Sequence, residues 1–390
     1  MNRDQWPAVA GFGPYAADCS HFNGYKPCQF KRLCQGCPHY SPQDTRILVI
    51  NLDAMGDVVR STALLPPLKR KYPQSHITWL TLKMCASILE HNPYLDEVLF
   101  YGPETVLELE PRAFDVVCNV DKSRRSGALA QRVRAAERFG FGVNEWGAIV
   151  PLSPEAGYQY QTGLDDELKF FTNRRNEQEI LAETMGVEYR RDPYVLELTA
   201  GEREFVAIRR REWGLDGDGV VVGLNTGCSE AFPYKRLPVE YQARLVDELC
   251  RRHPEIRVVL LGGPEDRERN PEIAGLASSP VIETPCDEGL RRGILYTDLA
   301  DVVVTGDTLG MHLAIGLQKR VVAWFGLSCA QEIDFYDRGQ PILAGVTCRP
   351  CWRRACDQSE KCFESVDMEE MLEATGHQIE AARKEKQYRR

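Results

Sequence analysis

An alternation of short apolar segments with helical segments runs through this chain twice, and it restricts the fold more than any other feature. The apolar segments are rich in β-branched residues, and helical patterns fill the intervals, as in a doubly wound parallel sheet. They lie at residues 47–50, 77–82, 98–101 and 114–120 in the first half and at 220–225, 257–261, 281–283, 302–305 and 320–324 in the second. The sequence therefore predicts an α/β protein in which two Rossmann-like domains follow one another and enclose a cleft.

Four segments are expected along the chain. They are a polar, Cys-rich extension at 1–42, the two Rossmann-like domains at 43–195 and 196–345, and a cysteine cluster with a charged C-terminal helix at 346–390. A helix over residues 166–185 is expected to close the first domain. Residues 190–199 then connect the two domains.

Composition excludes several classes of protein. The 390 residues are 43% hydrophobic and 27% charged, which is ordinary for a globular protein with room for two or three domains. No apolar run approaches the roughly 20 residues that span a bilayer, and the N-terminus lacks the apolar core of a signal peptide. We therefore expect a cytoplasmic protein, with peripheral contact to an anionic membrane face through the basic runs at 209–211 and 383–390. The net charge of −9 argues against general binding to nucleic acids.

The stretch Thr305-Gly-Asp-Thr-Leu-Gly-Met-His312 follows an apolar strand and leads into a helix that is expected to begin near Thr308. The first turn of such a helix points unpaired backbone N–H groups and the positive end of its dipole at whatever lies above the strand. Asp307, Thr308 and His312 crowd the same turn. This combination suits a phosphorylated ligand that carries hydroxyl groups, such as a nucleotide-sugar. The alternative is an ordinary strand-to-helix loop with a capping threonine.

A second strand-to-helix turn favours the ligand. The strand at residues 45–50 is followed by Asn51-Leu-Asp-Ala-Met-Gly-Asp57 and by a helical pattern over residues 58–72. Gly56 lets the backbone turn closely, and Asp57 stands at the start of the helix. The Asp57 carboxylate either caps this helix or projects over the carboxyl ends of the strands, where open α/β sheets bind their ligands.

These motifs resemble those of the heptosyltransferases of glycosyltransferase family nine, which build the inner core of lipopolysaccharide. The similar stretches are Ile47-Leu-Val-Ile-Asn-Leu-Asp-Ala-Met-Gly-Asp-Val-Val59, His91-Asn-Pro-Tyr-Leu-Asp-Glu-Val98, Val222-Gly-Leu-Asn-Thr-Gly227 with Lys235-Arg-Leu-Pro238, Val258-Val-Leu-Leu-Gly-Gly-Pro-Glu265, the turn at Asp307, Ala323-Trp-Phe-Gly326 and the cluster from Cys348. Several motifs match in order over roughly residues 45–365, which is more specific than one glycine loop. The resemblance implies the GT-B fold. It also implies transfer of heptose, or a related sugar, from ADP-heptose to a lipopolysaccharide core or similar glycan, with inversion at the anomeric carbon.

The resemblance implies roles for single residues as well. Asp57 matches the general base that activates the acceptor hydroxyl, with Asp53 as the fallback, and Lys235 matches the cation on the departing diphosphate. The residues expected to bind the nucleotide-sugar are Thr226, Gly227, Ser229, Lys235, Arg236, Gly263, Glu265, Asp307, Thr308, Leu309, Gly310 and His312. They fall in the second domain, so the first domain is expected to select the acceptor. The usual family turn reads Asp-Thr-Gly-Pro-Met-His, whereas here the glycine stands one place later, at Gly310.

A basic stretch is the candidate acceptor surface. Residues 122–138 contain six basic residues against the single acid Glu137. The stretch is either a solvated helix face or, through Arg124, Arg125 and Arg132, a surface for an anionic acceptor such as a phosphorylated lipid A–sugar.

Fourteen cysteines are many for a protein expected in the cytoplasm, where disulfides are disfavoured. Eight of them form two sets, Cys19, Cys28, Cys34 and Cys37, and Cys348, Cys351, Cys356 and Cys362. Each set contains a Cys-x-x-Cys turn and four thiols, which can complete a tetrahedral zinc or iron site. A structural metal at one or both sets is the favoured interpretation, and free or oxidisable thiols or an iron–sulfur cluster are the alternatives. No cofactor is expected for catalysis.

Three other functions stay open. The same fold can glycosylate a protein or another glycan, it can form a non-catalytic, metal-stabilised binding protein, or the cysteine clusters can belong to a redox enzyme. Asp57 and Lys235 argue against the second, and the lack of a flavin or radical signature argues against the third.

Overall fold

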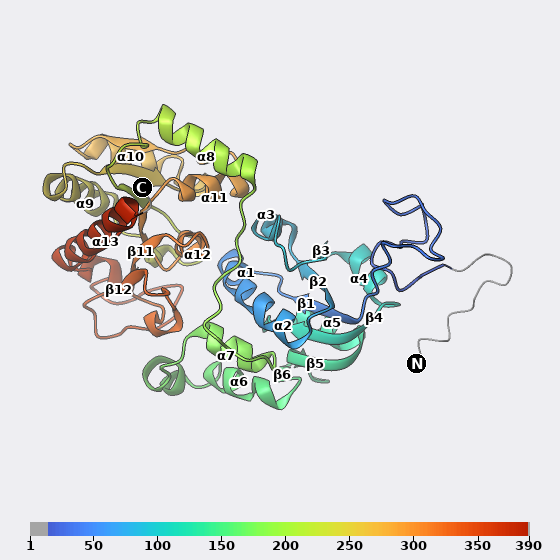
Figure 1. Cartoon of the computed structure of the whole chain (residues 1–390). Helices are drawn as coiled ribbons and strands as arrows, with labels where there is room; N and C mark the ends of the chain where they lie inside the picture. Colours follow the sequence, from blue (N-terminus) through green and yellow to red (C-terminus); the bar gives the residue numbers. More distant parts are fainter. Residues whose placement is uncertain (1–14, 389–390) are drawn as a thin grey trace.

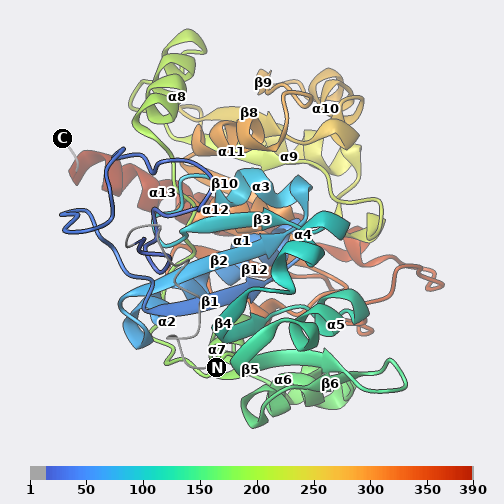
Figure 2. The same cartoon turned by 90° about the vertical axis from the view of Figure 1, so that its right-hand side faces the viewer.

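The structure of the protein, a computed structural model, describes residues 15–388 and contains two α/β domains side by side (Figure 1). The N-terminal sheet has six strands in the order β3-β2-β1-β4-β5-β6, which Figure 2 shows in sequence across the sheet. The strands are β1 (Thr45–Ile50), β2 (Ser75–Thr81), β3 (Glu97–Phe100), β4 (Ala113–Asn119), β5 (Arg134–Val143) and β6 (Ile149–Pro151). All pairs are parallel except β5 with β6, so β6 is an antiparallel edge.

The C-terminal domain repeats this arrangement. Its six parallel strands pair in the order β12-β11-β10-β7-β8-β9. The strands are β7 (Val221–Asn225), β8 (Arg257–Leu261), β9 (Val281–Glu283), β10 (Val302–Gly306), β11 (Arg320–Phe325) and β12 (Gly339–Leu343). Counted from its own first strand, each sheet has the order 3-2-1-4-5-6 of dinucleotide-binding sheets. The predicted fold of two Rossmann-like domains is confirmed.

Helical segments connect the strands. In the N-terminal domain they are α1 (Met55–Ser61), η2 (Thr62–Leu64), α2 (Leu65–Lys71), η3 (Lys83–Cys85), α3 (Ala86–Leu89), α4 (Pro103–Leu109), α5 (Arg124–Arg132), η4 (Pro154–Ala156), α6 (Gly157–Thr162), η5 (Leu168–Thr172) and α7 (Glu177–Thr184). In the C-terminal domain they are α8 (Ala200–Glu212), η6 (Pro233–Lys235), α9 (Val239–Arg252), η7 (Pro264–Asp266), α10 (Arg269–Leu276), α11 (Leu290–Asp298), α12 (Leu309–Gly316), η8 (Ala330–Glu332), η9 (Cys362–Ser365) and α13 (Met368–Tyr388).

One helix prediction is wrong. The helix expected over residues 166–185 is split into η5, a single π-helical turn, and α7. Asn173 lies between them and accepts a hydrogen bond from the Tyr158 hydroxyl (2.8 Å). Asn176 then caps α7 by accepting from the Glu179 N–H (2.9 Å). Two asparagines that bond locally thus interrupt the helix.

The apolar pattern also misses β5, β6 and β12. The basic residues beyond Arg132, which belong to the stretch interpreted as a possible helix face, lie on β5, where the Arg138 guanidinium donates to the backbone carbonyls of Ala130 and Val133. These strands lie toward the ends of their sheets, with β6 and β12 at the edges. Such strands lack the continuous apolar run of a strand that is buried on both faces.

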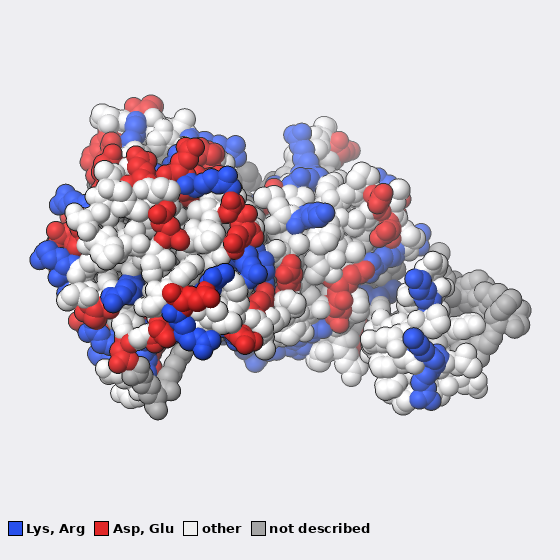
Figure 3. Space-filling view, turned by 90° about the horizontal axis from the view of Figure 1, so that it is seen from above, with Lys and Arg blue, Asp and Glu red and all other residues white. Residues whose placement is uncertain are grey.

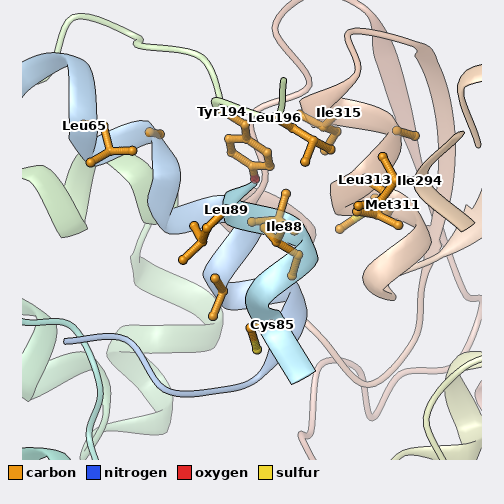
Figure 4. Packing of buried hydrophobic residues seen from close by; sticks show 14 of the residues in the cluster. Leu65, Cys85, Ile88, Leu89, Tyr194, Leu196, Ile294, Met311, Leu313 and Ile315 are labelled. Atoms are coloured by element: carbon orange, nitrogen blue, oxygen red, sulfur yellow. The ribbon is translucent and has the colours of Figure 1, made fainter. Parts of the chain in front are cut away.

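One hydrophobic cluster joins the two domains (Figure 4). Helix α3 contributes Ile88 and Leu89, and the C-terminal domain contributes Ile294 of α11 and Met311 of α12. All four side chains are at most 2% exposed. The domains therefore share a continuous core along their contact, which we call the seam.

Helices α1 and α12 meet at the seam where glycines allow a close approach. A Cβ at Gly56 would stand 2.9 Å from Cδ2 of His312, and a Cβ at Gly316 would stand 3.2 Å from the Cβ of Leu196 and 3.6 Å from a methyl group of Val59. Gly56 thus leaves room for the His312 ring, and Gly316 leaves room for the side chains of Leu196 and Val59. This contact sets how the first turn of α1 faces the first turn of α12.

The connection between the domains is extended and runs along the seam. Tyr194 and Leu196 are at most 7% exposed. The Val195 N–H donates to the Thr62 hydroxyl (2.8 Å), and the Asn92 amide donates to the Val195 carbonyl (3.3 Å). The connection is therefore part of the packed structure.

The two ends of the described chain differ. Residues 15–44 form a loop-rich segment at the side of the N-terminal domain that faces away from the C-terminal domain (Figure 1). The predicted C-terminal helix is confirmed as α13, which buries Met371 and Ile379 in the C-terminal core. No helix within residues 15–388 has the length and apolar character needed to cross a membrane.

We expect Gly56→Ala to lower the free energy of unfolding by about 1–3 kcal/mol, because the added methyl group meets the buried His312 ring. Gly201→Ala is the matched control, since a Cβ there meets nothing within 4 Å and alanine favours helix α8. Denaturant unfolding of the two variants and the wild type is the measurement. Equal stability of Gly56→Ala and wild type would show that the α1–α12 contact can relax without cost.

Candidate active site

The two turns that the sequence motifs single out lie together in the structure. Helix α1 follows β1 and helix α12 follows β10, so both first turns stand at the carboxyl ends of their sheets. The contact between Gly56 and His312 joins these turns at the seam. Residues from both domains therefore form one site.

Asp57 faces this site from the first turn of α1. It is not a helix cap, because the N-cap residue is Ala54 and no side chain caps α1. Its Oδ1 accepts a hydrogen bond from Nη2 of Arg60 (2.6 Å), and 47% of the Asp57 side chain is exposed. Arg60 is 16% exposed and also lies 4.0 Å from the carboxylate of Glu177. One oxygen of Asp57 is thus held by a buried guanidinium while much of the carboxylate stays accessible.

A buried carboxylate that the motifs do not single out holds the β1–α1 loop. Asp121 is 8% exposed and accepts hydrogen bonds from the Asn51 amide (2.6 Å) and the Leu52 N–H (2.7 Å). Burial raises the pKa of Asp121 to about 7 against the effect of these donors. Its position two residues past β4, at the carboxyl edge of the sheet, is the signal that could have identified it.

Lys235 and Asp307 form a buried ion pair on the C-terminal side of the site. Nζ of Lys235 lies 2.6 Å from Oδ2 of Asp307, and the side chains are 14% and 12% exposed. Burial alone would raise the pKa of Asp307, but Lys235 and His312 hold it below its ordinary value. Asp307 is therefore ionised at neutral pH and serves as the counter-ion of Lys235.

The first turn of α12 points its backbone donors into the same site. Thr308 is the N-cap residue, and no side chain caps the helix. The N–H groups of Leu309 and Gly310 belong to the first turn, which has no acceptors within the helix. Asn225, at the end of β7, donates to the hydroxyls of Thr305 and Thr308 (3.1 Å each). This amide ties the loops after β7 and β10 together.

His312 lies between the carboxylates of the two domains. Burial, together with the Arg60 guanidinium, lowers its pKa to about 4, although Asp307 and Asp57 act in the opposite direction. Tyr194 of the connection stacks on the imidazole with ring centroids 6.1 Å apart, and its hydroxyl lies 3.4 Å from Nδ1. His312 is therefore neutral at pH 7 and separates the domains as an uncharged polar group.

Beside the site, a further carboxylate of the C-terminal domain pairs with a lysine of the N-terminal domain. Glu332 of η8 is 8% exposed, and burial together with Glu177 raises its pKa to about 7. Nζ of Lys169, from the N-terminal domain, lies 3.5 Å from Oε1 of Glu332. The motifs single out neither residue, because their contact depends on the way the two domains pack.

Thr226 and Gly227, both expected to bind the nucleotide-sugar, are buried in the loop after β7. Thr226 is 1% exposed. A Cβ at Gly227 would overlap the carboxylate of Asp266, whose Oδ2 accepts the Gly263 N–H (2.9 Å). Asp266, at 5% exposure, organises the loops after β7 and β8, whereas the motif points to its neighbour Glu265.

The other predicted donor residues of these loops lie at the rim. Ser229 and Glu265 are exposed. Arg236 pairs with Glu230, with Nη1 and Oε1 2.9 Å apart. These side chains are accessible to a ligand that lies across the loops.

The three arginines of the predicted acceptor surface are exposed on α5. Nη2 of Arg125 lies 2.9 Å from Oδ1 of Asp53, and Arg132 pairs with Glu110. Asp53, the alternative base, is thus paired with a surface guanidinium. The pair also brings the N-terminal end of α5, with Arg124, beside the β1–α1 loop.

Neither cysteine set forms a metal site in the structure. Within residues 15–388, no group of three or more His, Cys, Asp or Glu side chains is close enough together to hold one ion. All four thiols of the second set line one cavity of about 150 Å³ beside Tyr234 and Gly326. The first set is spread over the loops of residues 15–44, where Cys19 is buried and the other three are half-buried.

Comparison with known proteins gives consistent matches. The sequence model described as glycosyltransferase family 9 (heptosyltransferase) matches residues 106–362. Lipopolysaccharide heptosyltransferase 1 of Campylobacter coli is 21% identical over 350 residues, which cover 84% of this chain and 97% of that protein.

Two solved structures are similar over most of the chain. The glycosyltransferase family 9 protein of Veillonella parvula DSM 2008 has a TM-score of 0.70 at 19% identity, covering 86% of this chain and 98% of that one. The ADP-heptose lipopolysaccharide heptosyltransferase II of E. coli has a TM-score of 0.64 at 18% identity, covering 86% and 99%. These structures show that the fold is shared.

We expect His312 to make the protein less stable as the pH falls from about 6.5 to about 4. Its pKa is about 4 in the folded protein and roughly 6.5 when unfolded, so in this window the unfolded chain binds more protons and stability falls with acidification, by at most about 3.4 kcal/mol. His312→Asn removes this proton uptake and should flatten the dependence. Thermal unfolding of both proteins between pH 4.5 and 7 measures the difference. Parallel curves would assign the acid sensitivity to other groups.

Proposed function

The chain belongs to glycosyltransferase family 9, the heptosyltransferase family, and on this basis we propose that it transfers heptose or a related sugar from ADP-heptose to a glycan of the lipopolysaccharide-core type. The observation that carries the proposal is the meeting of Asp57, from one domain, with the Lys235–Asp307 pair, from the other, on either side of His312. A base on one side and a cation with helix N–H donors on the other are the requirements of a direct, inverting displacement.

The C-terminal domain supplies the donor site in this proposal. The diphosphate of ADP-heptose binds at the first turn of α12, where the N–H groups of Leu309 and Gly310 and the helix dipole favour negative charge. Lys235 turns its ammonium from Asp307 to the diphosphate oxygens. The Asp307 carboxylate is then free to accept hydrogen bonds from sugar hydroxyls.

The N-terminal domain supplies the base. Asp57 takes the proton of the acceptor hydroxyl while the oxygen of that hydroxyl attacks the anomeric carbon. The bond from this carbon to the diphosphate breaks, and the leaving group departs with the electron pair toward Lys235. Arg60 holds Oδ1 of Asp57 and orients the carboxylate. Attack on the face opposite the leaving group inverts the anomeric centre.

The acceptor is proposed to approach over α5. Arg124 and Arg125 lie beside the β1–α1 loop, so a phosphorylated acceptor bound there presents its hydroxyl to Asp57. Over most of the face of the molecule in Figure 3, basic and acidic residues are interspersed. A protein or an uncharged glycan is the alternative acceptor and does not need these arginines.

We also propose that the second cysteine set holds a structural zinc or iron ion, because its four thiols line one cavity and thiolates are preferred ligands of both metals. The thiols do not converge in the structure, so the loop has to close around the ion. Anaerobically purified protein should carry about one zinc or iron atom per chain. Cys351→Ser should remove it, whereas Cys250→Ser, outside both sets, should not. Elemental analysis that finds neither metal in the wild type would contradict this proposal.

Asp57→Asn should leave the affinity for ADP-heptose near that of the wild type and lower turnover by about a hundredfold or more, as expected for loss of a general base. Calorimetric titration with ADP-heptose and a product assay measure the two effects. Asp53→Asn is the matched control on the same loop and should keep most of the activity. Turnover of Asp57→Asn within a few-fold of wild type would exclude Asp57 as the base.

A further inference from the structure

The loop that carries the second cysteine set also brings one aromatic side chain to the active site. This loop follows β12 and runs into η9, which begins at the last cysteine of the set, and Trp352 is its aromatic residue. Nζ of Lys235 lies 4.8 Å from the centroid of the Trp352 ring, and Nζ of Lys169 lies 5.0 Å from it. Both distances fall within the roughly 6 Å range of a cation–π interaction. The indole thus contacts one ammonium group from each domain.

Local structure fixes the position of this ring. The backbone N–H of Trp352 donates to the Leu327 carbonyl (2.8 Å), and the residue has a φ of +51°, which is uncommon for a residue with a side chain. Phe232, from the loop after β7, packs edge-to-face on the indole, with centroids 6.0 Å apart at 84°. A strained backbone that is held by a hydrogen bond and a ring contact indicates that the direction of this side chain is specified by the fold.

The Trp352 ring attracts the ammonium of Lys235 regardless of which anion pairs with that ammonium. Before the donor binds, the partner is Asp307 at 2.6 Å. In the proposed function the partner becomes the diphosphate. A lysine side chain has many rotamers, and an attraction that does not depend on the anion restricts the ammonium to the region that both anions can reach.

We propose that Trp352 is a positioning residue for the donor, which holds the ammonium of Lys235 at the diphosphate site. This proposal rests on the proposed function, because it assigns Lys235 to the donor diphosphate. Lys169 lies at the same ring, and its Nζ also lies 3.5 Å from Oε1 of Glu332, so the second cation near the ring has an acidic partner of its own. In this proposal the cysteine-rich loop contributes to donor binding, because it carries Trp352.

The test uses the full chain and ADP as the probe. Trp352→Leu should raise the Kd for ADP about 3- to 30-fold, the range of a partly buried cation–π interaction. Trp352→Phe, which keeps an aromatic face, should recover most of the affinity. Trp146→Leu is the control, because Trp146 is 80% exposed. Equal ADP affinity in Trp352→Leu and wild type would overturn the proposal.

A double-mutant cycle with Lys235→Met separates this role from a structural one. If Trp352 acts through Lys235, then Trp352→Leu has no further effect on ADP affinity once Lys235 is replaced. A full additional loss in the double variant would mean that the tryptophan supports the site in another way. An unchanged Kd in Lys235→Met alone would instead refute the proposed donor site.

A second variant covers the case in which Trp352→Leu does not fold. A fluorinated tryptophan placed at position 352 keeps the shape of the ring and draws negative charge from its face, so it weakens the attraction to a cation. ADP affinity should fall stepwise with the number of fluorine atoms while the thermal unfolding temperature stays constant. A constant affinity across this series would overturn the proposal.

Discussion

The contact between α1 and α12 is the constraint on which the rest of the active site depends. One helix belongs to each domain, and each begins at the carboxyl end of a central strand. Because Gly56 leaves no side chain between them, the imidazole of His312 lies directly against the α1 turn. The separation between the groups of the two domains is thus set by helix packing and a shared core. Sites built on packed elements hold their geometry better than sites built on loops alone.

The charged groups around His312 meet in pairs of opposite sign. Lys235 pairs with Asp307, and Arg60 with Asp57. A buried charge without a partner is costly. In the proposed function, an incoming diphosphate replaces Asp307 as the partner of Lys235, and the buried Asp307 carboxylate then needs the hydrogen bonds of the sugar hydroxyls. His312, which is neutral at pH 7, lies between the two pairs.

The central strands and the two turns could be predicted from the sequence, because both are local signals. Buried parallel strands are continuous apolar runs, and a carboxylate after such a run marks the ligand edge of the sheet. The outer strands β5, β6 and β12 lack that run. Asp121 follows such a run and could have been identified by its position, but its bond to Asn51 could not. Trp352 escapes the pattern, because its importance comes from Lys235, a partner far away in the chain. Only packing of the whole chain shows such pairs.

The hydrophobic cluster shared by the domains limits how freely enzymes of this architecture can exchange their halves. A chimera that joins this N-terminal domain to the C-terminal domain of a relative must match the apolar faces of α3 and α11 as well as the active-site motifs. It must also preserve a small residue opposite the imidazole of α12. New combinations of N-terminal and C-terminal domains are therefore constrained by the packing of this interface, and successful recombination should favour breakpoints that leave the whole interface from one parent.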